Sequence, residues 1–149
     1  MKYDFYGITT LLKNMLLEDD DINTVLFGID DYRNLYKKSI YPIAHINPVE
    51  ADLTSAQILE YTFEISVTDK RDLSKSKIEG KWQSNDNEID TLNTCHIVLN
   101  RLLFRLKQID DIFMINLIKL TPITMREFDL VDGFLMRITI VVPNDIQIC

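Results

Sequence analysis

The stretch Leu59–Thr68 reads Leu-Glu-Tyr-Thr-Phe-Glu-Ile-Ser-Val-Thr, and apolar and polar side chains alternate along all ten of its residues. Successive side chains of a β-strand point to opposite faces of its sheet, so this pattern predicts a long strand with one buried and one solvated face. Residues 134–142 repeat the same period between Gly133 and Pro143. Two amphipathic strands need a second layer of structure to cover their apolar sides.

Two segments have the spacing of helices that could form this layer. Apolar side chains recur every three or four residues within Phe5–Leu16, and Asp4 is a candidate cap for the start of that helix. The second segment, Ile89–Leu106, follows a start that resembles a capping box, formed by Asn85 and Glu88. We therefore expect one helix before the long strand and a longer one after it.

The remaining apolar segments predict shorter strands. Val25–Ile29 is expected to be a brief buried strand, and 112–121 a strand buried on both faces that Pro122 interrupts. Prolines 42 and 48 lack a backbone N–H, so we expect Tyr41–Ile46 to be an edge strand or an extended segment, followed by a turn or loop over 51–57. The prediction is an α+β fold, in which a mixed or antiparallel sheet of about four to five strands carries two helices on one face.

Composition limits the class of protein. The 149 residues fit one domain, 1–149, and a hydrophobic share of 46% supports a packed core. Sixteen basic against twenty-three acidic residues give a net charge of −7, which disfavours sequence-independent binding to nucleic acid. No apolar run is long enough for a membrane span and no signal peptide is recognisable. These features predict a soluble, acidic protein made inside the cell.

Candidate chemical sites are few. A calcium loop starting at Asp19 would need Gly and Glu where the chain has Thr24 and Asp30, so a solvated acidic turn is the better interpretation. Cys95 and His96 are neighbours, and adjacent helical side chains point about 100° apart, which excludes a nucleophile–base pair on one face. We predict no enzyme, no catalytic residue, no cofactor and no metal, although an enzyme that uses His45 or His96 remains a third reading.

The polar stretch at about 70–87 is predicted to protrude as a loop or arm. It concentrates cationic side chains in an acidic protein and contains the only tryptophan; these residues are Lys70, Arg71, Lys75, Lys77, Lys81 and Trp82. One reading is an arm whose tryptophan anchors it on a partner subunit. The other is a surface hairpin whose tryptophan packs back on its own domain. The charge contrast favours the first, with the arm on the acidic face of an identical subunit.

The order of these motifs resembles the small neck and tail-terminator proteins of tailed bacteriophages. The shared features are Tyr41-Pro-Ile-Ala-His-Ile46 with Pro48, the long strand ending at Asp69, the leucine-rich helix end at Leu102–Leu106, and the run from Asp129 through Asp132-Gly133-Phe134 to Ile140. Twenty isoleucines against three alanines suggest an AT-rich genome, such as those of crAss-like phages.

The resemblance implies a structural virion protein, made in the cytoplasm of the bacterial host, that forms a six-fold or twelve-fold ring at the head–tail junction. Such a ring contacts portal, neck and tail proteins and lets genomic DNA pass without sequence-specific binding. Tyr41 and Pro42 join the arm residues as expected subunit contacts. The alternative is a monomeric or dimeric adaptor that binds a peptide along an exposed sheet edge at Tyr41–Ile46.

Overall fold

The computed structural model describes residues 3–28, 40–72, 76–110, 112, 114–126 and 130–144. The order of elements is α1 (Phe5–Leu17), β1 (Thr24–Phe27), β2 (Ile43–Ser55), β3 (Ile58–Lys70), β4 (Ser76–Glu79), β5 (Trp82–Asn85), α2 (Asp86–Leu106), β6 (Met114–Arg126) and β7 (Val131–Pro143).

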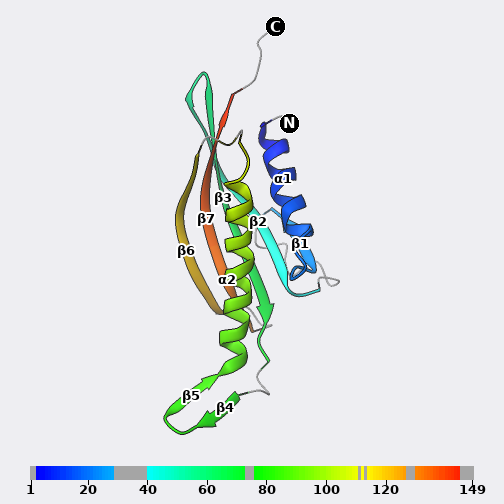
Figure 1. The fold of residues 1–149 in the computed structure, drawn as a ribbon, viewed down its shortest axis with the longest axis vertical. Coiled ribbons are helices and arrows are strands. Elements are labelled where there is room, and N and C mark those ends of the chain that lie inside the picture. The colour runs from blue at the N-terminus through cyan, green and yellow to red at the C-terminus, as the bar shows by residue number, and fades with distance from the viewer. Residues whose placement is uncertain are drawn as a thin grey trace.

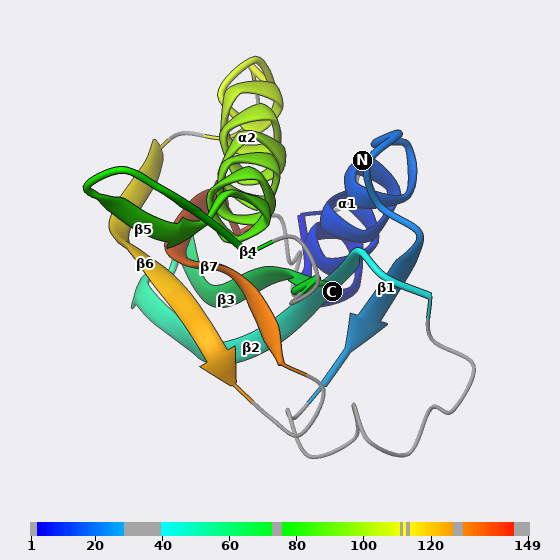
Figure 2. The ribbon, with the colours of Figure 1, turned by 90° about the horizontal axis from the view of Figure 1, so that it is seen from below.

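The described strands form one mixed five-stranded sheet and a separate hairpin. The sheet has the order β1-β2-β3-β7-β6, in which β1 is parallel to β2 and every other neighbouring pair is antiparallel. Both helices cover the same face of this sheet (Figures 1 and 2). The predicted α+β class, with a single main sheet and two helices on one face, is confirmed.

The core lies between the helices and the two central strands. Alternate residues of β3 and β7 face the helices, as the period-two pattern predicts, and the apolar stripe of each helix meets them. The buried side chains are Ile8, Leu12 and Leu16 of α1; Val98, Leu99, Leu102 and Leu106 of α2; Tyr61, Phe63, Ile65 and Val67 of β3; and Met136, Ile138, Ile140 and Val142 of β7. The Asp4 carboxylate caps α1 by accepting the Gly7 N–H at 2.8 Å, as predicted.

The polar face of β3 is less exposed to solvent than its sequence suggests. Thr62, Ser66 and Thr68 are buried, because β3 is the middle strand and short side chains on it are shielded by those of its neighbours. The Thr62 and Thr139 hydroxyls lie 2.9 Å apart and hydrogen-bond across the β3–β7 pair. Small hydroxyl residues thus let the centre of the helix-free face exclude water while satisfying their polar atoms.

The edge position predicted for Tyr41–Ile46 is wrong, because β1 pairs in parallel with Ile43–Ile46, although the chain is extended from Ile43 onward as expected. The turn or loop predicted for 51–57 is wrong for 51–55, since β2 continues along β3 to Ser55, and only residues 56 and 57 form the turn. Beyond Ile46, β2 has no partner on its outer side among the described residues. Pro48 is tolerated there because it needs no N–H on an open side.

β1 and β6 are also more exposed to solvent than predicted. β1 is not buried as predicted, because Phe27 is 53% exposed and its other three residues are partly exposed. β6 is an edge strand with Asn116 and Lys119 exposed, so it is not buried on both faces. It also continues through Pro122 to Arg126, because an edge strand tolerates the missing N–H.

Candidate functional site

The predicted protruding segment is built around the β4–β5 hairpin, hereafter the arm (Ser76–Asn85), which lies beyond the end of the main sheet (Figure 1). Glu79 pairs with Trp82 across a two-residue turn of Gly80 and Lys81. Gly80 has φ +60°, a left-handed conformation that favours glycine at this turn. Trp82 and the exposed Lys81 therefore occupy the tip of the arm.

The base of the arm is held by a buried ion pair. Arg71 Nε lies 2.5 Å from Asp132 Oδ2, and Arg71 Nη2 lies 2.8 Å from Asp132 Oδ1. The same Nη2 is 2.8 Å from Glu88 Oε1 at the start of α2. The Arg71 side chain is only 8% exposed and that of Asp132 is 0% exposed. A bidentate pair of this kind fixes geometry as well as charge.

Backbone contacts complete the base. The Arg71 N–H donates to the Leu130 carbonyl at 3.0 Å, which joins the end of β3 to the residue before β7. The Asp72 N–H donates to the Asn87 side-chain oxygen at 2.6 Å. The chain that enters the arm is thereby tied to the chain that leaves it, so the arm starts from a fixed position on the domain.

Electrostatics at the base favour fixed charge over proton transfer. The hydrogen bonds that Arg71 donates to the Asp132 carboxylate raise the pKa of Arg71, which keeps the guanidinium charged. Burial raises the pKa of the nearby Cys95 thiol to about 12, and the charges of Asp69 and Asp132 add to this effect. A neutral, buried thiol is a poor nucleophile. The cluster thus has the properties of a structural clamp.

The two histidines both lie in contact with other parts of the fold. His96 makes an edge contact with Phe134 at 5.3 Å between ring centroids, and its Nδ1 lies 3.2 Å from Asn100 Nδ2. His45 is buried in β2 and faces Ser66 across the β2–β3 pair. Both side chains are therefore accounted for by packing in the described part of the fold.

The sequence-predicted contact residues fall into three groups. Lys70, Tyr41 and Pro42 lie together at the end of β3, where Lys70 Nζ is 5.2 Å from the centroid of the Tyr41 ring. Arg71 belongs to the buried base described above. Lys77, Lys81 and Trp82 are on the arm, and Lys75 lies outside the described residues.

Tyr41 and Pro42 are positioned by the segment that precedes β1. The Asn23 and Thr24 N–H groups donate to the Pro42 carbonyl at 3.0 and 3.3 Å. The Asn23 side-chain amide donates to the Tyr41 carbonyl at 2.6 Å. These bonds hold the Tyr41 backbone beside the end of β3, next to Lys70.

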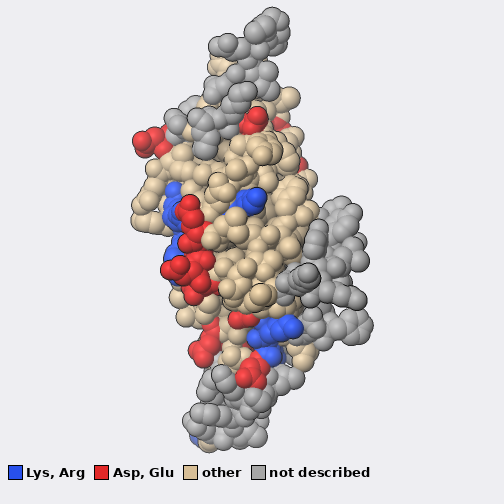
Figure 3. All heavy atoms as spheres, turned by 90° about the vertical axis from the view of Figure 1, so that its right-hand side faces the viewer, with Lys and Arg blue, Asp and Glu red and all other residues tan. Residues whose placement is uncertain are grey.

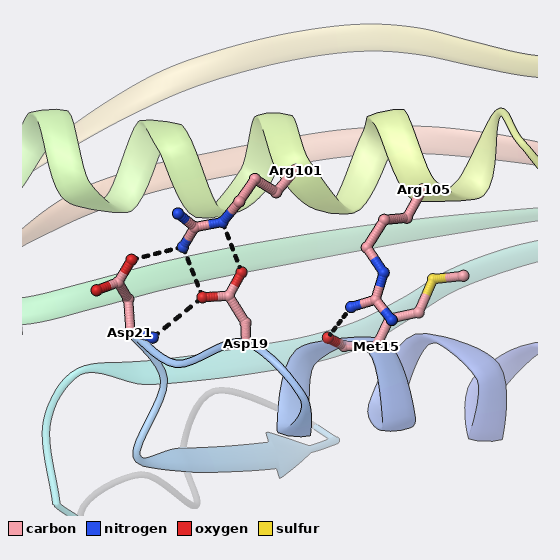
Figure 4. Close-up of polar contacts among 5 residues, drawn as sticks. All are labelled: Met15, Asp19, Asp21, Arg101 and Arg105. Carbon is pink, nitrogen blue, oxygen red and sulfur yellow. Dashed lines mark hydrogen bonds and ion pairs between the residues drawn. The ribbon is translucent and has the colours of Figure 1, made fainter.

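A second arginine cluster was missed by sequence reasoning. Arg101 on α2 donates to Asp19 at 2.9 and 2.6 Å and to Asp21 at 2.5 Å (Figure 4). Arg105, one turn later, donates to the Met15 carbonyl at 2.9 Å and pairs with Glu18. The expected acidic turn is present, but Asp19 and Asp21 bind Arg101 and thereby link the end of α1 to α2. Two arginines four residues apart on α2 were the available signal.

Within the described ranges, no group of three or more His, Cys, Asp or Glu residues is placed to hold a metal ion. Neither described helix combines the length and apolar character needed to cross a membrane. No protein family matches this chain, and no curated protein sequence matches it significantly. The contacts described above are those of a folded domain whose arm is held at its base by Arg71, Asp132 and Asn87.

Proposed function

We propose that this chain is a structural virion protein that forms a ring at the head–tail junction of a tailed bacteriophage. As a connector or tail terminator, it would join the portal and neck to the tail and provide a conduit for DNA. The proposal is supported by the resemblance of its ordered motifs to neck and tail-terminator proteins and by an α+β domain with a projecting arm. The chain would be made in the host cytoplasm and reside in the virion.

The observation that carries the proposal is the anchored arm. A two-stranded hairpin on its own is marginally stable, yet this one is tied at both ends through Arg71, Asp132 and Asn87. A fixed base reduces the conformational entropy that the arm would lose on docking. An arm that reaches one neighbour while the body receives another arm gives head-to-tail contacts, and these close into rings when the rotation per copy permits.

Charge is consistent with this arrangement. The net charge of −7 leaves an acidic body for the cationic tip at Lys81, and it repels the phosphates of DNA moving through a conduit. Such a ring would assemble faster at low salt, because its contacts pair unlike charges.

The test is the mass of the assembly in solution. Purified chain, alone and with candidate neck proteins, is examined by mass photometry across micromolar concentrations for particles six or twelve times the 17.4 kDa chain mass. Trp82→Ala should shift particles toward monomer by about tenfold in concentration, since tryptophans often anchor interfaces. Phe104→Ala removes a 66% exposed aromatic residue of α2 and is the matched control. A monomer under every condition would contradict the proposal.

A second candidate function is a peptide-binding adaptor. The edge first predicted for it, Tyr41–Ile46, is occupied by β1 from Ile43 onward. The outer side of Asn47–Ser55 is unpaired within the described chain, and this favours strand addition at a different place. Small complexes with a peptide ligand, without any ring, would support the adaptor instead.

A further inference from the structure

The main sheet ends in two different open edges. β6 has a single neighbour, β7, and β2 has none beyond Ile46 on the side away from β3, as far as the described residues go (Figures 1 and 2). Open edges present unpaired N–H and C=O groups that can template another strand. Because the two edges belong to different strands, one copy could offer β6 while another offers β2.

The two edges carry opposite charges on the same face of the sheet. Glu50 and Asp52 of β2 are exposed and lie opposite Thr62 and Glu60 of β3, on the helix-free face. Lys119 of β6 is exposed and lies opposite Arg137, which in turn lies opposite Glu64 of β3. Alternate residues of β3 share a face, so Lys119 is on the helix-free face as well.

These edge charges have no ion-pair partner among the residues that the structure describes. No ion pair within the described chain involves Glu50, Asp52 or Lys119, whereas Arg137 already lies 3.6 Å from Glu64. These three charges would meet opposite signs if the β6 edge of one copy met the β2 edge of another. A contact between two β6 edges would bring lysine to lysine, and one between two β2 edges would bring carboxylates together.

The helix side of the open β2 edge is apolar. Leu53 is 71% exposed and Tyr6 of α1 is 79% exposed. Phe5 stacks near Phe63, which places the start of α1 over the sheet close to this edge. The side of the molecule that carries α1 shows few charged side chains at its centre (Figure 3). A strand added here would therefore gain backbone hydrogen bonds and also cover apolar surface.

We infer that β6 of a second copy adds to the open part of β2, with Lys119 of that copy facing Glu50 and Asp52. Within one chain β6 runs antiparallel to β2, because the pairs β2–β3, β3–β7 and β7–β6 are each antiparallel. Copies placed side by side in one orientation therefore pair these edges antiparallel. This inference rests on the proposed ring, for which it names a second contact between neighbours besides the arm.

Two prolines and β1 set the length of this contact. β1 occupies Ile43–Ile46, and Pro48 has no N–H, so the available segment of β2 is Val49–Ser55. On β6 the segment before Pro122 is Met114–Thr121, which contains Lys119. Prolines at these positions also discourage pairing with unrelated strands. The match of opposite charges would then select which strand pairs with this edge.

The test is a charge swap in the full chain. One variant is Lys119→Glu, and the other combines Glu50→Lys with Asp52→Lys. Each variant alone should raise the concentration for half-assembly by about tenfold, because the contact becomes repulsive. An equimolar mixture should assemble within about twofold of the parent chain, since each acidic edge then meets a basic one. Lys107→Glu, an exposed lysine at the end of α2, is the control.

The outcomes separate the contact from the ring itself. Circular dichroism spectra matching those of the parent chain show that the variants fold, and mass photometry follows assembly. Loss in each variant with recovery in the mixture supports the β6–β2 contact. Rings that form equally well in all variants, or a mixture that stays dissociated, overturn this contact while the ring remains. A parent chain that is monomeric even with neck proteins contradicts both.

Discussion

The two arginine clusters use the same chemistry in different surroundings. Arg71 and Arg101 each make a bidentate contact with an aspartate and reach a second carboxylate. Their side chains are 8% and 43% exposed. The first cluster joins β3, β7 and the start of α2, and the second joins α2 to the segment after α1.

The difference shows how burial sets the role of an ion pair. At the surface, water and salt screen the Arg101 contacts, so they contribute little beyond aligning two helices. In the interior, removing one member of the Arg71–Asp132 pair would leave an uncompensated charge out of reach of water. The base of the arm is therefore the place where a single substitution should matter most.

The largest effect is expected for Arg71→Met. It removes the arginine charge that compensates the buried Asp132 carboxylate and should lower the free energy of unfolding by about 3–5 kcal/mol, measured by urea denaturation. The double variant Arg71→Met with Asp132→Leu removes both charges and should recover most of this loss. A single variant that loses less than about 1 kcal/mol would show that the pair is hydrated in solution.

Gly133→Ala tests the packing beside that pair. A Cβ on Gly133 would lie 1.9 Å from the Val67 carbonyl oxygen and 2.8 Å from the Thr68 Cα, and both are backbone atoms. β7 must then move away from β3 next to Asp132. We expect a loss of about 1–3 kcal/mol in the free energy of unfolding. An unchanged urea midpoint would mean that β3 and β7 are farther apart here than the structure shows.

Local pattern predicted much of the fold, because period-two and helical spacing survive in β3, β7, α1 and α2. It failed at β2. Residues 51–55 have no clear strand pattern in the sequence, but they form a strand because β3 pairs with them. Pro122 was likewise expected to interrupt its strand, but β6 continues past it because the edge strand pairs with β7 on one side only. Which strands are neighbours depends on contacts distant in sequence, and composition alone does not contain that information.

The site was predictable only as a segment. A run of lysines near a tryptophan indicated an arm, and β4 and β5 lie within it. The role of Arg71 was hidden, because its partner Asp132 is sixty-one residues away and looked like part of a turn. Asp19 and Arg101, eighty-two residues apart, were hidden for the same reason.

A smaller effect is expected for Arg101→Met. The side chains of Arg101 and Asp21 are 43% and 45% exposed, and Asp19, only 9% exposed, also accepts the Asp21 N–H, so the loss at low ionic strength should be about 1 kcal/mol. Raising the salt to roughly 0.5 M should remove most of this difference through screening. The Arg71→Met loss, measured in the same two buffers by urea denaturation, should persist. Equal salt dependence of the two variants would contradict the contrast between them.

The smallest effect concerns Asp69, next to the buried cluster. Burial raises the pKa of this carboxyl, and the Lys70 N–H that it accepts only partly opposes the shift. A carboxyl whose folded pKa lies above its unfolded value contributes stability below the unfolded pKa and loses it as the pH rises through the folded pKa. Asp69→Asn keeps the acceptor without the charge, so it should stabilise the fold at pH 7 and have no such advantage in acid. Thermal unfolding between pH 3 and 8 measures this, with Asp110→Asn as the exposed control. A gain that does not depend on pH would show that the amide acts through packing and not through the charge beside the arginine pair.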